Sequence, residues 1–251
     1  MFLPIHGAGF YDTRHAQPGH KVSDFVVSSY VPTLSILTLS SNFSTPPSGD
    51  LRLLTVCQPS SDGLSHLPGV ATELTHIREV VMDSPSAHIT LLESSDGTVE
   101  GVLSLMKRAD WVHFACHGIQ DAANPTSSGL CLADGRRLKL RDMIAVSRSH
   151  GGLAFLSACQ TAMGDEGLSD EAIHIAAGML FAGYGGVIGT MWSISDKLAP
   201  RVARDVYGQL FRNGTRPDYR EAAGALHEAI ERLRHSNASF VEWLPFIHVG
   251  L

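Results

Sequence analysis

Two apolar runs, Trp111-Val-His-Phe-Ala-Cys-His-Gly118 and Leu153-Ala-Phe-Leu-Ser-Ala-Cys159, decide the fold of this chain. Each has the length of a buried strand, and each leads to a chemically potent side chain, His117 in the first run and Cys159 in the second. The two residues are 42 positions apart (159 − 117), so only the fold can bring them together. Parallel strands would do so, because open α/β sheets bind ligands outside the carboxyl ends of neighbouring strands.

The sequence around these runs predicts a mostly parallel sheet. From Leu51 onward, apolar runs of strand length (51–57, 88–92, 111–116, 153–158 and 186–192) alternate with helical stretches (70–82, 98–107, 170–182, 195–211 and 218–234). Residues 129–140 predict a hairpin around an Asp-Gly turn, inserted between the third and fourth core strands. Residues 243–249 are apolar enough for an edge strand. We therefore expect an α/β/α sandwich.

The chain length and the first 50 residues bear on the domain organisation. A chain of 251 residues is long enough for one large α/β domain, so we expect a single domain over 1–251, with N-terminal elements (1–50) packing on the core (51–251). Residues 1–24 read as an irregular lead-in with a broken strand over 3–6, and 24–39 as a strand that stops at Pro32 before a short helix. The abrupt start suggests the C-terminal part of a larger protein.

The composition excludes several classes of function. The net charge is −6 and the 19 Lys and Arg residues are scattered, so nucleic acid binding has no electrostatic basis. No apolar run approaches the roughly 18 residues of a membrane span, and no signal-peptide pattern opens the chain. Four cysteines without close spacing read as free thiols. We expect a cytoplasmic protein.

The two run endings together suggest a cysteine-histidine dyad. A thiol attacks as its thiolate and therefore needs a base within hydrogen-bond reach. Taken singly, His117 could be a loop histidine without a role and Cys159 a small buried hydrophobe. Zinc is disfavoured, because strand alternation turns Cys116 away from His113 and His117 and a fourth ligand is missing. Haem attachment and nucleotide binding lack their motifs, so no cofactor is expected.

Several motifs then resemble one family, the CHAT domain, a branch of the caspase-like cysteine peptidases that includes separase. The resemblance spans nearly the whole chain, in the order that the family uses. It is carried by 3–8, 28–34, His113-Phe-Ala-Cys-His-Gly118, Ser128-Gly-Leu-Cys-Leu-Ala-Asp-Gly135, Leu156-Ser-Ala-Cys-Gln-Thr-Ala162, Asp170-Glu-Ala-Ile-His-Ile-Ala-Ala-Gly-Met-Leu180, Gly189-Thr-Met-Trp-Ser-Ile-Ser-Asp196 and 245–250.

This resemblance implies a caspase-like three-layer α/β/α sandwich with a mostly parallel central sheet and a β-hairpin insertion. It implies that Cys159 is the nucleophile, that His117 is the general base, and that the backbone N–H of Gly118 serves the oxyanion. The caspase signature Gln-Ala-Cys-x-Gly is only partly matched by Ser157-Ala-Cys-Gln-Thr161. Such domains are often the C-terminal effector of a larger protein with a regulatory repeat or sensor domain, in the same or another chain.

Substrate preference is weakly indicated by the sequence. Cleavage after Arg or Lys needs an acid in the receiving pocket, and Asp165 and Glu166 are the nearest candidates, although a Gly-Asp-Glu-Gly stretch is also an ordinary solvated turn. Trp192 and Ser193 could line the same pocket. We expect a caspase-like cysteine endopeptidase acting on a protein or peptide. The alternatives are a catalytically silent interaction module and a flavodoxin-like small-ligand domain, and the hairpin speaks against the second of these.

Overall fold

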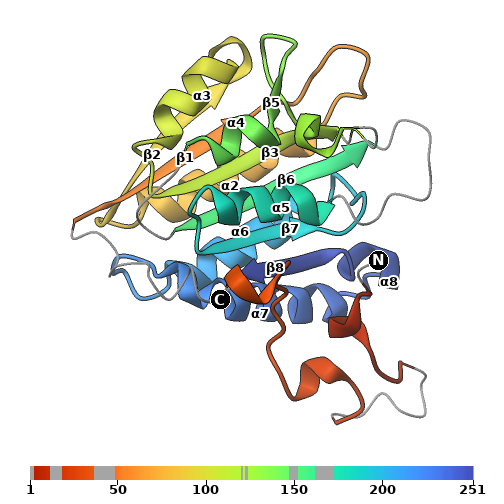
Figure 1. Ribbon diagram of the computed structural model, residues 1–251. Helices are drawn as coiled ribbons and strands as arrows, with labels where there is room; N and C mark the ends of the chain where they lie inside the picture. The colour runs from red at the N-terminus through yellow and green to blue at the C-terminus, as the bar shows by residue number, and fades with distance from the viewer. Residues whose placement is uncertain are drawn as a thin grey trace.

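The structure, a computed structural model, describes residues 3–11, 19–36, 49–119, 121, 124–146, 152–161 and 172–250; for 125, 159–161 and 172–174 the description is limited to the backbone. Figure 1 shows a twisted central sheet with helices on both faces and the N-terminal segment beside its lower edge. The mixed α/β architecture and the mostly parallel sheet agree with the fold predicted from the sequence.

The sheet runs in the order β2-β1-β3-β6-β7-β8, with β4 and β5 attached to β3 as a hairpin. Its strands are β1 (Leu51–Cys57), β2 (Ala87–Glu93), β3 (Trp111–Ile119), β4 (Gly129–Cys131), β5 (Arg137–Lys139), β6 (Leu153–Thr161), β7 (Gly186–Thr190) and β8 (Phe246–Gly250). The first five strands of that order are mutually parallel, and β8 is antiparallel to β7. The carboxyl ends of β1, β3, β6 and β7 therefore lie at the same end of the sheet.

Helices bury the two faces because consecutive strand residues point to opposite sides. On one face, α3 (Val99–Met106), α4 (Leu140–Ile144) and α5 (Ala172–Phe181) cover a core that includes Phe114 and Leu156. On the other, α2 (Gly69–Met82), α6 (Ala199–Leu210) and α7 (Ala222–His235) cover a core with Leu53 and Phe155. The short helix α8 (Phe240–Trp243) precedes β8.

The hairpin of β4 and β5 lies where the sequence predicts it. Gly118 and Ile119 at the end of β3 pair with Leu130 and Gly129 of β4, and β4 pairs with β5. This pairing makes β3 longer than the expected 111–116, because its last residues are held on both sides. The insertion therefore follows Ile119, two residues after the candidate base, His117.

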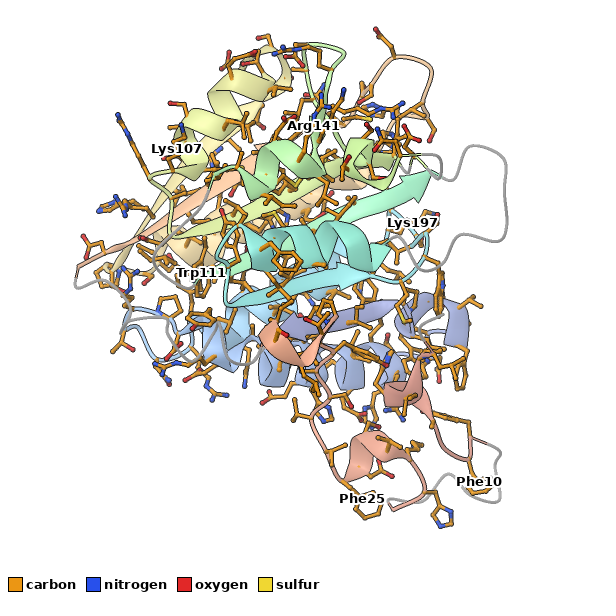
Figure 2. The ribbon with its side chains drawn as sticks, in the orientation of Figure 1. Phe10, Phe25, Lys107, Trp111, Arg141 and Lys197 are labelled. Carbon is orange, nitrogen blue, oxygen red and sulfur yellow. The ribbon has the colours of Figure 1, made fainter. Side chains whose placement is uncertain are left out.

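The N-terminal segment packs along β8. Tyr30 forms a parallel bridge with Val249, its N–H donating to the His248 carbonyl at 2.9 Å and its own carbonyl accepting from Gly250 N–H at 2.9 Å. The broken strand predicted over 3–6 is wrong: Ile5–Gly7 form a 3-10 helix, because His6 is drawn toward Tyr30 Oη and the Leu244 carbonyl. Phe10 and Phe25 project from this segment and are 64% and 74% exposed (Figure 2).

Candidate functional site

The strand register places the two predicted dyad residues side by side. His117 and Cys159 are Cα partners in the parallel pairing of β3 with β6, next to the carboxyl ends of both strands. Partners in adjacent strands lie about 5 Å apart, so the backbone separation suits a hydrogen-bonded pair of side chains. The side chain of Cys159 lies outside the described residues.

One ring nitrogen of His117 is engaged by the backbone and the other is not. Nε2 lies 2.7 Å from the Ser65 carbonyl oxygen, in the loop between β1 and α2. A carbonyl oxygen only accepts, so Nε2 carries the hydrogen and donates it. Nδ1 is then the basic nitrogen; it is buried and has no hydrogen-bond partner among the described residues. The imidazole is thus held in the tautomer that can take a proton at Nδ1.

A buried polar cluster lies beneath the dyad on the face covered by α2 and α6. Glu73 of α2, 2% exposed, accepts a hydrogen bond of 2.9 Å from Ser157 Oγ, two residues before Cys159. Glu73 Oε1 also lies 3.1 Å from His113 Nε2, which is within ion-pair distance, but the two atoms are not aligned for a hydrogen bond. His113 Nδ1 lies 3.2 Å from Tyr207 Oη. These contacts tie β3, β6, α2 and α6 together under the site.

The other three cysteines are unsuited to nucleophilic chemistry. Cys57, Cys116 and Cys131 are all buried. Burial, together with the nearby Glu73 and Glu93 carboxylates, raises the pKa of Cys57 to about 12, so this thiol stays protonated at neutral pH. Burial also raises the pKa of Cys131. These residues pack in the core.

Gly118 lies within β3, between Leu130 and Gln160, and borders a small apolar cavity. The cavity measures about 20 Å³, room for roughly one water molecule. The described residues that line it are Gly118, Leu130, Leu156, Ala158, Ile175, Gly189 and Thr190, and none of these is charged. In this conformation it does not admit a Lys or Arg side chain.

The tentative substrate-binding residues fall in two places. Asp165 and Glu166 lie outside the described residues. Trp192 and Ser193 occupy the loop between β7 and α6, beside the end of β6; Trp192 is partly buried against the core on the α5 face, and Ser193 is exposed. The structure therefore puts one predicted pair near the dyad strands.

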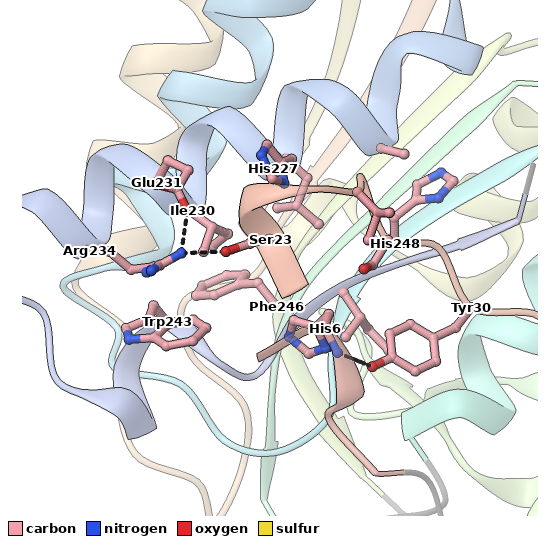
Figure 3. A pocket seen from close by; sticks show the side chains of 15 residues that line it. His6, Ser23, Tyr30, His227, Ile230, Glu231, Arg234, Trp243, Phe246 and His248 are labelled. Atoms are coloured by element: carbon pink, nitrogen blue, oxygen red, sulfur yellow. Dashed lines mark hydrogen bonds and ion pairs between the residues drawn. The ribbon is translucent and has the colours of Figure 1, made fainter. Parts of the chain in front are cut away.

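A second cavity, of about 40 Å³, lies on the far side of β7, between the N-terminal segment, α7 and β8 (Figure 3). Several of its polar side chains pair with one another: His6 Nδ1 lies 2.7 Å from Tyr30 Oη, and Arg234 contacts Glu231 and donates to Ser23 Oγ at 2.9 Å. These contacts fasten the N-terminal segment to the core. Within the described ranges, no group of three or more metal-ligating side chains converges.

Two parts of the site were not predicted from the sequence. Glu73 carries a signal in retrospect, because it occupies an apolar-face position of α2 among Val70, Leu74, Ile77 and Val81. Ser65 carries none, since its contribution is a backbone carbonyl that every residue has.

Among the helices that the structure describes, none is long and apolar enough to cross a membrane.

Comparisons with known proteins agree with this architecture. The family model of the CHAT domain matches residues 11–251, whereas a search of curated proteins finds no significant match. Among solved structures, the complex of the Porphyromonas gingivalis RgpB pro- and mature domains aligns with a TM-score of 0.51 at 11% identity, covering 79% of this chain and 47% of that one. The Arg-specific cysteine proteinase gingipain R (RGPB) gives 0.53 at 11%, covering 79% and 46%.

The Saccharomyces cerevisiae separase-securin complex aligns with a TM-score of 0.56 at 14% identity, covering 92% of this chain and 14% of that one. This chain thus spans less than half the length of these neighbours. At such low identity the likeness concerns the fold, which is that of caspase-like cysteine proteases. The resemblance inferred from the sequence motifs is confirmed by the family match.

Proposed function

Because this chain belongs to the CHAT domain family, we propose that it is a cysteine endopeptidase that cleaves a protein substrate with a Cys159-His117 dyad. The observation that carries the proposal is the pairing of these two positions at the carboxyl ends of β3 and β6. It is supported by the tautomer of His117, whose Nδ1 is free to accept a proton while Nε2 donates to Ser65.

In the proposed reaction, His117 takes the thiol proton and the Cys159 thiolate attacks the peptide carbonyl. The backbone N–H of Gly118 would stabilise the negative charge that develops on the carbonyl oxygen. Collapse of the tetrahedral intermediate breaks the C–N bond, and the imidazolium returns its proton to the leaving amine. Water, deprotonated by the same imidazole, then hydrolyses the thioester and regenerates the thiol. Every step uses groups of this chain, the substrate and water.

Regulation follows from the burial of the base. His117 is 1% exposed, so a peptide contacts the imidazole only after part of its cover moves. We therefore propose an effector domain whose activity depends on an opening step, driven by a regulatory segment or a partner protein. Two structural neighbours are complexes with a bound protein, a pro-domain in one and securin in the other, and this is compatible with control by a bound protein.

The same burial favours a second candidate, a catalytically silent module that binds other proteins through the caspase-like fold. The two are separated by incubating wild type, Cys159→Ala and His117→Ala with a peptide library and reading cleavage by mass spectrometry. We expect cleavage by the wild type and a loss of at least about 100-fold in both variants. The library also reveals the residue preferred before the scissile bond.

Unchanged circular dichroism spectra would show that the variants are folded. Equal cleavage by wild type and Cys159→Ala would contradict the mechanism. If none of the three proteins cleaves any peptide, even after limited proteolysis of the N-terminal segment, the silent module is the better account.

A further inference from the structure

The orientation of the candidate base depends on a single loop. The Ser65 carbonyl that accepts from His117 Nε2 at 2.7 Å lies in the connection of residues 58–68, between β1 and α2. If Ser65 moves, the imidazole loses the acceptor that fixes its tautomer and ring orientation. What holds this loop therefore bears on whether Nδ1 is presented as a base.

At its β1 end, the loop is held by the sheet and by its own contacts. Gln58 N–H donates to the Ala115 carbonyl at 2.9 Å, which continues the pairing of β1 with β3. Leu67 N–H donates to the Pro59 carbonyl at 2.8 Å, and the Leu67 side chain is buried in a cluster with Cys57 and with Val70 and Leu74 of α2. These bonds close the loop on itself but do not connect it to the other side of the dyad.

At its α2 end, the loop is held by a residue 127 positions away. Pro68 occupies the N-cap of α2 and makes no side-chain cap, so the helix needs another acceptor for Gly69 N–H. Asp196, in the loop between β7 and α6, supplies it through Oδ2 at 2.6 Å. The approach is so close that a Cβ at position 69 would lie 2.1 Å from the Asp196 backbone carbonyl oxygen.

This bridge spans the two strands that carry the dyad. The loop before α2 leaves β1, next to β3, and the loop before α6 leaves β7, next to β6. Both helices cover the same face of the sheet and pack against each other there. The bond between Asp196 and Gly69 thus ties the loop that orients His117 to the loop that carries Trp192 and Ser193.

We propose that Asp196 is a positioning residue of the site: by capping α2 in trans, it fixes the loop whose Ser65 carbonyl holds His117 in its proton-accepting tautomer. This inference rests on the proposed peptidase function, since it assigns a second contribution to the same dyad. A purely structural cap would stabilise the fold and contribute nothing to the chemistry of Cys159.

The test is the rate at which iodoacetamide alkylates Cys159 between pH 5.5 and 9.5, followed by mass spectrometry of the peptide that contains it. No substrate is needed, and Cys57, Cys116 and Cys131 are buried, so the native protein reports on Cys159. In the wild type, a thiolate paired with imidazolium should react well below pH 8.5, the usual thiol pKa. For Asp196→Ala, we expect the rate at pH 6.5 to fall at least tenfold and the rise to move to about pH 8.5.

Asp196→Asn keeps an acceptor oxygen and should restore most of the wild-type profile, and Ser195→Ala, in the same loop, is the matched control with an unchanged profile. Gly69→Ala breaks the bridge from the other side and makes the same comparison if Asp196→Ala does not fold. A lower melting temperature with a wild-type pH profile in the bridge-breaking variants would reduce Asp196 to a structural cap and overturn the proposal. If the wild type itself reacts as an ordinary thiol, the dyad fails, and this inference with it.

Discussion

The buried histidine of β8 leads to a quantitative prediction about stability and pH. His248 is 1% exposed, and burial lowers its pKa to about 4. Its Nδ1 lies 2.7 Å from Ser29 Oγ, which donates its own hydrogen to the Gly250 carbonyl at 2.7 Å, so Nδ1 carries the ring hydrogen. Nε2 is buried and has no hydrogen-bond partner among the described residues. The folded state therefore holds a neutral imidazole.

The sign of the effect follows from this lowered pKa. The unfolded chain binds the proton with a pKa of about 6.5, so it takes up more protons than the folded chain as the pH falls. The contribution of neutral His248 to the free energy of unfolding is fully present above pH 6.5 and is lost as the pH falls toward 4. It changes no further below pH 4. Between pH 8 and pH 5 the loss from this residue is about 2 kcal/mol.

The assay is equilibrium urea unfolding, followed by circular dichroism, of wild type and His248→Asn at pH 8, 7, 6 and 5. The Asn amide nitrogen can replace Nδ1 as the donor to Ser29 but does not titrate in this range. Between pH 8 and pH 5, the free energy of unfolding of the wild type should therefore fall by about 2 kcal/mol more than that of His248→Asn. His88→Asn is the matched control, because it makes the same substitution at a side chain that is 70% exposed. Parallel slopes for wild type and His248→Asn would refute the reasoning.

Two further substitutions test the packing around the site. Gly129→Ala puts a Cβ 2.2 Å from the Leu138 carbonyl oxygen, so the two strands of the hairpin should separate. We expect the free energy of unfolding in urea to fall by more than about 2 kcal/mol and trypsin to cleave earlier at Arg137. An unchanged urea midpoint would contradict the tight pairing of β4 with β5. Asp110 is 4% exposed and accepts from Arg52 N–H at 2.9 Å and from the Arg52 guanidinium at 3.0 Å, so Asp110→Asn should cost about 1–3 kcal/mol near pH 7. A thermal midpoint equal to that of the wild type would count against a stabilising ion pair between Asp110 and Arg52.

The sequence predicted the sheet well because its strands are strongly patterned. Runs such as Leu51–Cys57 are buried on nearly every residue and were recognised as core strands of a parallel sheet. The 3-10 helix at Ile5–Gly7 was mistaken for a strand, since its contacts with Tyr30 and Leu244 come from parts of the chain that no local pattern reveals. Long-range contacts decided the structure there.

The adjacency of the two candidate residues could be predicted from the sequence, whereas the backbone contacts around them could not. His117 and Cys159 each follow an apolar run, and the register of β3 with β6 makes them neighbours; their catalytic roles stay a prediction. The role of Ser65 depends on the path of a loop, which is fixed by tertiary contacts such as the bond between Gly69 and Asp196. The contacts of Glu73 with Ser157 and His113 join a helix to two strands, so the local sequence around Glu73 does not reveal them.

The position of Tyr30 makes the two long edges of the sheet chemically unlike. At β8, the backbone of Tyr30 already occupies hydrogen-bonding groups of His248 and Gly250, which blocks that edge to another strand. At the opposite edge, β2 pairs with β1 and with no further strand in the described part of the chain. Among the described residues, Ala87–Glu93 is therefore the edge strand whose outer backbone groups no strand pairs, one strand beyond β1 from the dyad. Exposed His88 and Thr90 on this strand make it a poor template for aggregation.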